Sequence, residues 1–201
     1  GIQQARGVVP TYTDLLVERY IPGVDVVVGF LEGGPNGGVL EPMEHVIDAA
    51  YSRRYDVFDF ELKHHQQQYV TSRIPSGLPP QQVDRLRQLA SRVVSAFDLR
   101  DAATLDFRVA RDGEIYFLSA TALPTLQPDA HIAQLAAHAG IDYDTLIRRL
   151  VRTAAARAGI DVTRSKSTNA RKRPGLRVGL AFNLKRTDTG PVLVFTRTKH
   201  K

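Results

Sequence analysis

The 201-residue chain contains no cysteine and no apolar run of the ~18 residues that a membrane-spanning helix needs. Without cysteine, disulfide bridges and thiolate zinc sites are excluded, and a cytoplasmic location is expected. There is no secretory signal-peptide pattern, so no membrane association is expected either. Apolar residues make up 43% and charged residues 24%, as in an ordinary globular chain that can bury a core.

Acidic residues are scarce at the end of the chain. Residues 151–201 carry 13 Lys/Arg against 2 Asp/Glu, whereas residues 1–150 carry 14 against 19. The polar, basic stretch 161–175 has the composition of a linker. Its cations could neutralise nucleic-acid phosphates, but it lacks interleaved aromatic residues for base stacking. A solvated linker is therefore favoured, and a nucleic-acid partner is not expected.

The first half of the chain predicts strands joined by a glycine-rich loop. A β-branched run predicts a strand at 24–31, and the loop 33–38 then leads into a return strand beginning at Val39 and Leu40. This loop matches neither the P-loop nor the dinucleotide fingerprint, because no Lys-Ser/Thr pair and no helix follow it. A plain turn between strands is the favoured interpretation.

Helices are predicted where apolar residues recur at spacings of three and four. The clearest stripe runs from Val83 to Phe97, and Pro80 suits its first turn. Two further amphipathic helices are expected at 129–139 and 143–157, and short strands at the end of the chain. The predicted strands there are Leu176–Phe182 and Val192–Phe195.

The segment from Thr104 to Thr121 predicts a β-hairpin around Asp112-Gly113. A two-residue type I′ turn at this dipeptide sets the register of the ladder. Opposite pairs are then Arg111 with Glu114, Val109 with Tyr116, Asp106 with Ser119, and Thr104 with Thr121. Since side chains alternate, the last two pairs share one face. A carboxylate among hydroxyls could bind a cation or a ligand, or could simply be a polar sheet face.

The adjacent pair His64-His65 is a weak candidate for a metal site. Neighbouring side chains point in different directions on a helix or a strand, and no third ligand lies at a suitable spacing. A zinc site is not predicted.

The order of these elements and several motifs resemble the C-terminal part of the ATP-grasp domain of the D-alanine–D-alanine ligase family. The resemblance runs from about Asp14 to Ala156. The segment 17–25 is similar to the family's adenine- and ribose-binding stretch, and 58–63 to the stretch whose lysine meets the ATP phosphates. Leu105-Asp106-Phe107 and the following strand resemble its magnesium hairpin. The implied fold is α+β, a mostly antiparallel sheet with flanking helices.

The resemblance implies a set of ligand-binding residues. The nucleotide would contact Glu18, Arg19, Tyr20, Ile21, Asp25 and Lys63. The metal positions would be Asp106, Ser119 and Thr121. The implied chemistry is ATP-dependent activation of a carboxylate to an acyl phosphate, which an amine then attacks. That chemistry needs Mg²⁺ on hard oxygen ligands and cationic groups near the phosphates.

The sequence departs from the family pattern at the metal site. Ser119 stands where the family has Glu, Thr121 where it has Asn, and Thr104 where it has Arg. Thr125 replaces the Gly that follows Leu-Pro. One carboxylate with two hydroxyls should bind Mg²⁺ weakly. Binding of ATP and Mg²⁺ is therefore expected to be weak or lost, and no catalytic residue is assigned.

The expected organisation is a partial ATP-grasp domain at 1–160, a basic linker at 161–175 and the truncated start of a second ligase-like unit at 176–201. The favoured function is an impaired ligase-like module that keeps at most nucleotide binding. Two alternatives stay open: an active ligase in the full-length tandem protein, and a non-enzymatic module whose basic tail contacts nucleic acid. The expected partners are a nucleotide and a second ligase-like unit, in the same chain or in a homodimer. The sequence does not identify the substrate.

Overall fold

The computed structural model describes residues 18–51, 56–160, 182–187 and 190–195. The chain divides into two compact units, Gly1–Val162 and Thr163–Lys201. In the second unit, strands β6 (Phe182–Thr187) and β7 (Gly190–Phe195) form an antiparallel pair. Strand β7 confirms the strand predicted at Val192–Phe195. The linker 161–175 and all but the last residue of the strand predicted at Leu176–Phe182 lie outside the described residues.

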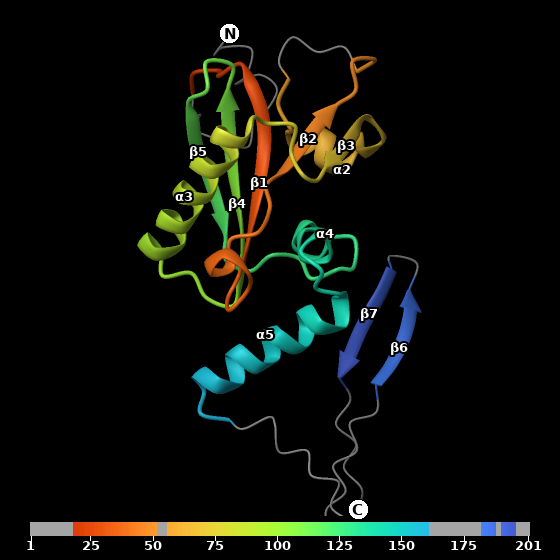
Figure 1. Cartoon of the computed structure of the whole chain (residues 1–201). Helices are drawn as coiled ribbons and strands as arrows, with labels where there is room; N and C mark the ends of the chain where they lie inside the picture. Colours follow the sequence, from red (N-terminus) through yellow and green to blue (C-terminus); the bar gives the residue numbers. More distant parts are fainter. Residues whose placement is uncertain (1–17, 52–55, 161–181, 188–189, 196–201) are drawn as a thin grey trace, which may run out of the picture. The chain divides into compact units, whose positions relative to one another are not determined.

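The first unit is built on a five-stranded antiparallel sheet in the order β3-β2-β1-β4-β5 (Figure 1). The strands are β1 (Gly23–Leu31), β2 (Met43–Ile47), β3 (Val70–Arg73), β4 (Ala102–Ala110) and β5 (Ile115–Thr121). This confirms the predicted α+β class with a mostly antiparallel sheet and flanking helices. No helix in the described part of the chain is long and apolar enough to cross a membrane.

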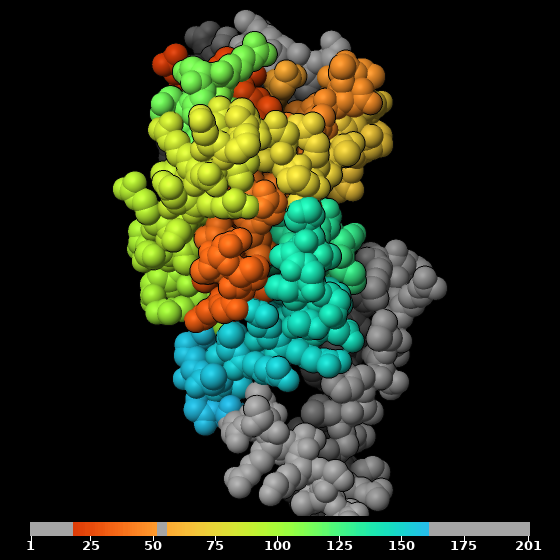
Figure 2. Space-filling model, viewed as in Figure 1, coloured from red at the N-terminus to blue at the C-terminus, as the bar shows by residue number. Residues whose placement is uncertain are grey.

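Helix α3 (Pro80–Ala96) covers one face of the sheet and overlies the strands in the space-filling view (Figure 2). Its buried residues Val83, Leu86 and Ala90 confirm the predicted apolar stripe. Leu86 and Ala90 share a core cluster with side chains of β1 and β4, including Val26, Val28, Leu105 and Phe107. The prediction was wrong for the last residue of the stripe, because Phe97 is the C-terminal cap of the helix and is 61% exposed.

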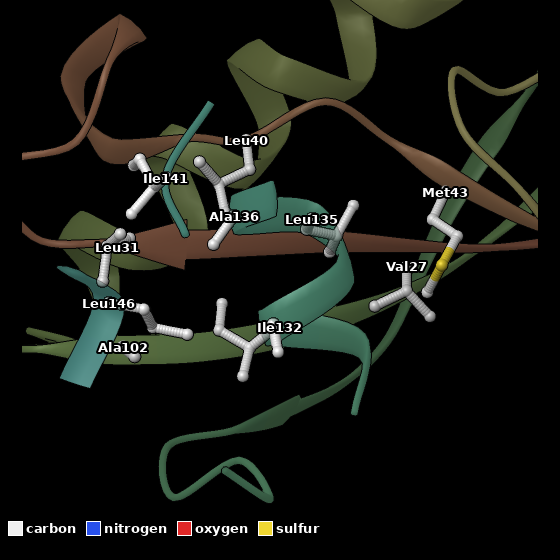
Figure 3. Close-up of a cluster of buried hydrophobic side chains, with 11 residues drawn as sticks. Val27, Leu31, Leu40, Met43, Ala102, Ile132, Leu135, Ala136, Ile141 and Leu146 are labelled. Carbon is white, nitrogen blue, oxygen red and sulfur yellow. The ribbon is translucent and has the colours of Figure 1, made fainter. Parts of the chain in front are cut away.

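Helix α4 (His131–His138) packs against the other face, over β1 and β4. Helix α5 (Tyr143–Arg157) lies at the end of the sheet, where Arg149 donates to Gly33 O and Thr153 Oγ1 donates to Asp101 Oδ1. A second cluster of buried side chains gathers between β1, β4 and α4 (Figure 3). Helix α4 comes so close at Gly29 that an added Cβ would stand 3.0 Å from Leu135 Cδ1. Asp142 caps α5, since its Oδ1 accepts a hydrogen bond from Thr145 N at 2.9 Å.

Three short helical segments lie in the connections. The 3₁₀ turn η1 (Asn36–Gly38) sits in the glycine-rich loop, which does join two strands. Val39 bridges to Phe30, and the regular return strand β2 begins only at Met43. Helix α2 (Phe60–His64) and the 3₁₀ turn η2 (Gln67–Tyr69) lie between β2 and β3. Helix α2 carries Lys63.

The β4–β5 hairpin confirms the predicted outer register but corrects the predicted turn. Its loop has three residues, because Ala110 N donates to Glu114 O at 2.8 Å and Gly113 N donates to Ala110 O at 2.9 Å. Only Gly113 in this loop has a positive φ, +89°, so the turn is not type I′. A type I turn closed by a left-handed glycine shifts the inner register by one residue.

The shifted inner register pairs Val109 with Ile115, not with Tyr116. A β-bulge then leaves Leu118 without an opposite residue and shifts the register back. Asp106 therefore faces Ser119, and Thr104 faces Thr121, as predicted. The two irregularities cancel before the ladder reaches the polar residues.

Candidate functional site

A cavity of about 450 Å³ opens on the α4 face of the sheet. Its wall comes from β2, α2, η2, β3, β4, the end of β5, the segment 124–130 and α4. Because residues distant in the sequence meet here, the sheet and helix α4 must both be in place before the cavity exists. Its charged and polar lining includes Lys63, His45, His131, Asp106, Thr104 and Thr121.

The hairpin supplies one of the two carboxylates that line the cavity, and Asp129 supplies the other. Thr104 and Asp106 are alternate residues of β4, so both side chains lie on the same face, and Thr121 lies opposite Thr104. Ser119 Oγ donates a hydrogen bond of 2.6 Å to Asp106 Oδ2. The structure thus brings together the three predicted metal positions, as one carboxylate among hydroxyls.

Helix α2 supplies a cation to the same cavity. Asp59 caps the helix by accepting from Leu62 N at 3.1 Å, and Leu62 is fully buried. One residue further on, the exposed Lys63 lines the cavity. A lysine and an aspartate that line one cavity from separate elements can hold an anion together with its counter-cation.

Two histidines in the wall were not singled out by the sequence as part of this site. The ring centroids of His45 and His131 lie 4.9 Å apart, and the Phe58 ring lies 4.0 Å from His45, tilted by 33°. Burial, with the nearby His131 and Lys63, lowers the pKa of His45 to about 3. Burial and Lys63 lower the pKa of His131, while Asp106 acts in the opposite direction. Both rings are therefore neutral at pH 7.

Five residues predicted to contact the nucleotide are not among the residues that line this cavity. They are Glu18, Arg19, Tyr20, Ile21 and Asp25. Asp25 instead lines a second hollow of about 270 Å³, next to Arg108, and His45 borders both hollows. The Asp25 carboxylate forms an ion pair with Arg108 at 2.8 Å. Arg108 was not identified by the sequence, because nothing local marks an arginine in a strand as the partner of Asp25.

The structure also places the other residues singled out in the sequence. Thr125, which replaces a family glycine, lines the cavity beside Pro124. His64 also lines it, whereas His65 forms a 3.1 Å contact with Glu61. Among the described residues, no group of three or more His, Cys, Asp or Glu side chains could hold a metal ion. The residues fit Mg²⁺ only where phosphate oxygens complete the ligand set of Asp106.

Comparison with known proteins identifies the family of the chain. Residues 5–152 match the family described as D-ala D-ala ligase C-terminus. The D-alanine–D-alanine ligase of Geobacillus kaustophilus is 27% identical over 137 residues, which are 68% of this chain and 35% of that protein. The enzyme of Agrobacterium fabrum is 27% identical over 152 residues, 72% of this chain and 45% of its own.

The fold recurs in solved structures of D-alanine–D-alanine ligase from Bacillus anthracis. One has a TM-score of 0.59 at 19% identity, over 79% of this chain and 48% of that one. A second, complexed with ATP, has a TM-score of 0.60 at 17% identity, over 79% and 47%. This chain spans less than half the length of these relatives. The chain therefore belongs to the D-alanine–D-alanine ligase family and carries the C-terminal part of its ATP-grasp fold.

Proposed function

We propose that the cavity is the phosphate-binding end of an ATP-grasp site that has lost much of its metal affinity. The observation that carries the proposal is that Lys63 and Asp106 line one cavity from separate elements. Lys63 offers an ammonium group to phosphate oxygens, and Asp106 offers a carboxylate on the sheet; Asp129, in the segment before α4, also lines the cavity. The family membership supports ATP as the ligand.

The weakness of the proposed metal site follows from the residues around Asp106. Mg²⁺, when bound, would neutralise charge on phosphate oxygens. Here Asp106 Oδ2 already accepts a hydrogen bond from the Ser119 hydroxyl, and the residues beside it on this face of the hairpin, Thr104 and Thr121, are neutral. Thr104, moreover, is a short neutral side chain that cannot reach an oxyanion as an arginine would. We propose that nucleotide binding persists and that ligation by this chain is strongly impaired.

Calorimetric titration of the chain with ATP, with and without Mg²⁺, tests the proposal. We expect weak binding with a small dependence on Mg²⁺. No heat at millimolar nucleotide would contradict retained binding and leave only a ligase-like scaffold.

A second candidate is an active ligase in a longer protein, in which other segments supply the missing groups. This candidate is favoured because the chain spans less than half the length of the ligases that it matches. Asp106→Asn in the full-length protein should then abolish turnover, while Asp84→Asn on the exposed side of α3 should not. Unchanged turnover in the Asp106 variant would rule this unit out as the catalytic one.

A further inference from the structure

An ion pair that sequence analysis did not identify lies beside the cavity. Arg108 Nη1 lies 2.8 Å from Asp25 Oδ2, and the two side chains are only 6% and 12% exposed. The two residues are opposite partners on β4 and β1. Burying two charges costs free energy unless further hydrogen bonds satisfy them. The further hydrogen bonds of the Arg108 and Asp25 side chains therefore identify the segments that this ion pair holds together.

The guanidinium of Arg108 binds three separate segments. Besides Asp25, its Nε donates to Ile21 O at 3.0 Å, and its Nη2 donates to Asp56 O at 2.5 Å. Its Cζ also lies 5.7 Å from the centre of the Tyr20 ring. A planar fork of donors suits this task because the donors keep a fixed relative geometry.

The carboxylate of Asp25 holds the same segment at a second point. Asp25 Oδ2 accepts a hydrogen bond from Phe58 N at 2.7 Å, 33 residues away in the sequence. Arg108 and Asp25 together therefore fix Asp56 and Phe58 against the sheet. This segment has no helix or strand of its own, so these bonds account for much of its placement.

The fixed segment leads directly into the helix that carries Lys63. Asp59 caps α2, and α2 is only five residues long. A helix this short is not stable by itself and depends on how its ends are held. The Phe58 ring, whose centroid lies 4.0 Å from that of His45, further orients the start of the helix.

We infer that Arg108, through Asp25 and residues 56–59, is a positioning residue that holds Lys63 over the cavity. The inference rests on the proposed role of Lys63 in binding phosphate. Arg108 does not line the Lys63 cavity, so it acts on a bound anion only through α2. Its loss frees the segment before α2 and lets Lys63 leave the position from which it meets the ligand.

A double-mutant cycle on the full chain tests the inference. Arg108→Met, Lys63→Met and the combined variant are titrated with ATP and with inorganic tripolyphosphate. We expect each single variant to weaken binding about tenfold, and the combined variant to bind no more weakly than Lys63→Met. Effects that multiply in the combined variant would overturn the inference. Arg85→Met, which removes a half-exposed arginine paired with Glu114, serves as the control.

Hydrogen exchange gives a readout that needs no ligand. We expect the amides of residues 56–64 to exchange about tenfold faster in Arg108→Met and unchanged in Arg85→Met. The variant Asp25→Asn/Arg108→Met, which leaves no unpaired buried charge, is measured alongside in case the single variant does not fold. Unchanged exchange in that paired variant would overturn the inference. A wild-type chain that binds neither ligand would overturn the proposed function instead, while exchange still decides the role of Arg108.

Discussion

The Ser119 hydroxyl donates a 2.6 Å hydrogen bond to the Asp106 carboxylate on one face of the β4–β5 hairpin. A neutral donor here stabilises a lone carboxylate without any metal. A second carboxylate at the same place would repel the first unless a cation lay between them. Metal binding at the proposed site therefore depends on one side chain opposite Asp106.

Replacing Ser119 and Thr121 by the Glu and Asn of the family pattern should therefore make nucleotide binding depend more strongly on Mg²⁺. We expect Ser119→Glu combined with Thr121→Asn to raise ATP affinity in Mg²⁺ by about tenfold, a change of ~1.4 kcal/mol, and to leave it unimproved without Mg²⁺. Titration calorimetry in the two conditions checks this. Ser91→Glu on the exposed face of α3 is the control for added charge. An equal gain without Mg²⁺ would show that the hairpin is not a metal site.

Helix α4 can line the cavity because Gly29 has no side chain. A Cβ there would stand 3.0 Å from Leu135 Cδ1, 3.1 Å from Leu40 Cδ1 and 3.3 Å from Ile132 Cδ1. We expect Gly29→Ala to lower the free energy of unfolding by about 1–3 kcal/mol through overpacking. Urea unfolding measures this, with exposed Ser91→Ala as a near-neutral reference. A midpoint as high as that of the wild type would mean that α4 is not tightly packed at this point.

Acid should destabilise the fold through His45, which is 4% exposed. Its pKa is about 3 in the folded chain against 6.5 ordinarily, chiefly because of burial. Between these two values the unfolded chain binds a proton that the folded chain does not. The contribution of His45 to the free energy of unfolding is therefore complete above pH 6.5. It is lost as the pH drops below that value, by at most about 1.4 kcal/mol per pH unit. His131 acts in the same direction.

Urea unfolding at pH 7 and pH 5 checks this dependence. We expect His45→Gln to lose a smaller part of its stability between the two pH values than the wild type does. His138→Gln, at an exposed position of α4, should keep the wild-type dependence. An undiminished loss in the His45 variant would exclude His45 as the cause.

Local sequence patterns were sufficient for the hairpin residues but not for their turn. Asp112-Gly113 predicted two residues of loop, yet Asp112 keeps a negative φ and its Oδ1 accepts from Glu114 N at 3.1 Å. The bulge at Leu118 has no mark in the sequence, and it restores the outer register only by offsetting the longer loop. The face shared by Asp106 and Ser119 was thus predicted correctly from a turn that was wrong.

The site was predictable where a motif is local and not where it depends on packing. Lys63 and Asp106 each lie in a short recognisable segment, and both line the cavity. His45 enters the site because β2 lies beside the start of α4, a relationship between residues far apart in the chain. Arg108 likewise finds Asp25 only through the pairing of β4 with β1. Such long-range contacts follow from the assembled sheet and cannot be read from neighbouring residues.

The central claim, that Lys63 and the cavity bind the phosphates of a nucleotide, is tested most directly by titrating wild-type and Lys63→Met chains with ATP in Mg²⁺. Lys166→Met, in the basic stretch outside the described residues, controls for non-specific attraction by charge. We predict weak saturable binding to the wild type, a loss of about tenfold in Lys63→Met and no change in the control. Equal affinity of the wild type and Lys63→Met, or no binding to the wild type at millimolar ATP, would contradict the claim.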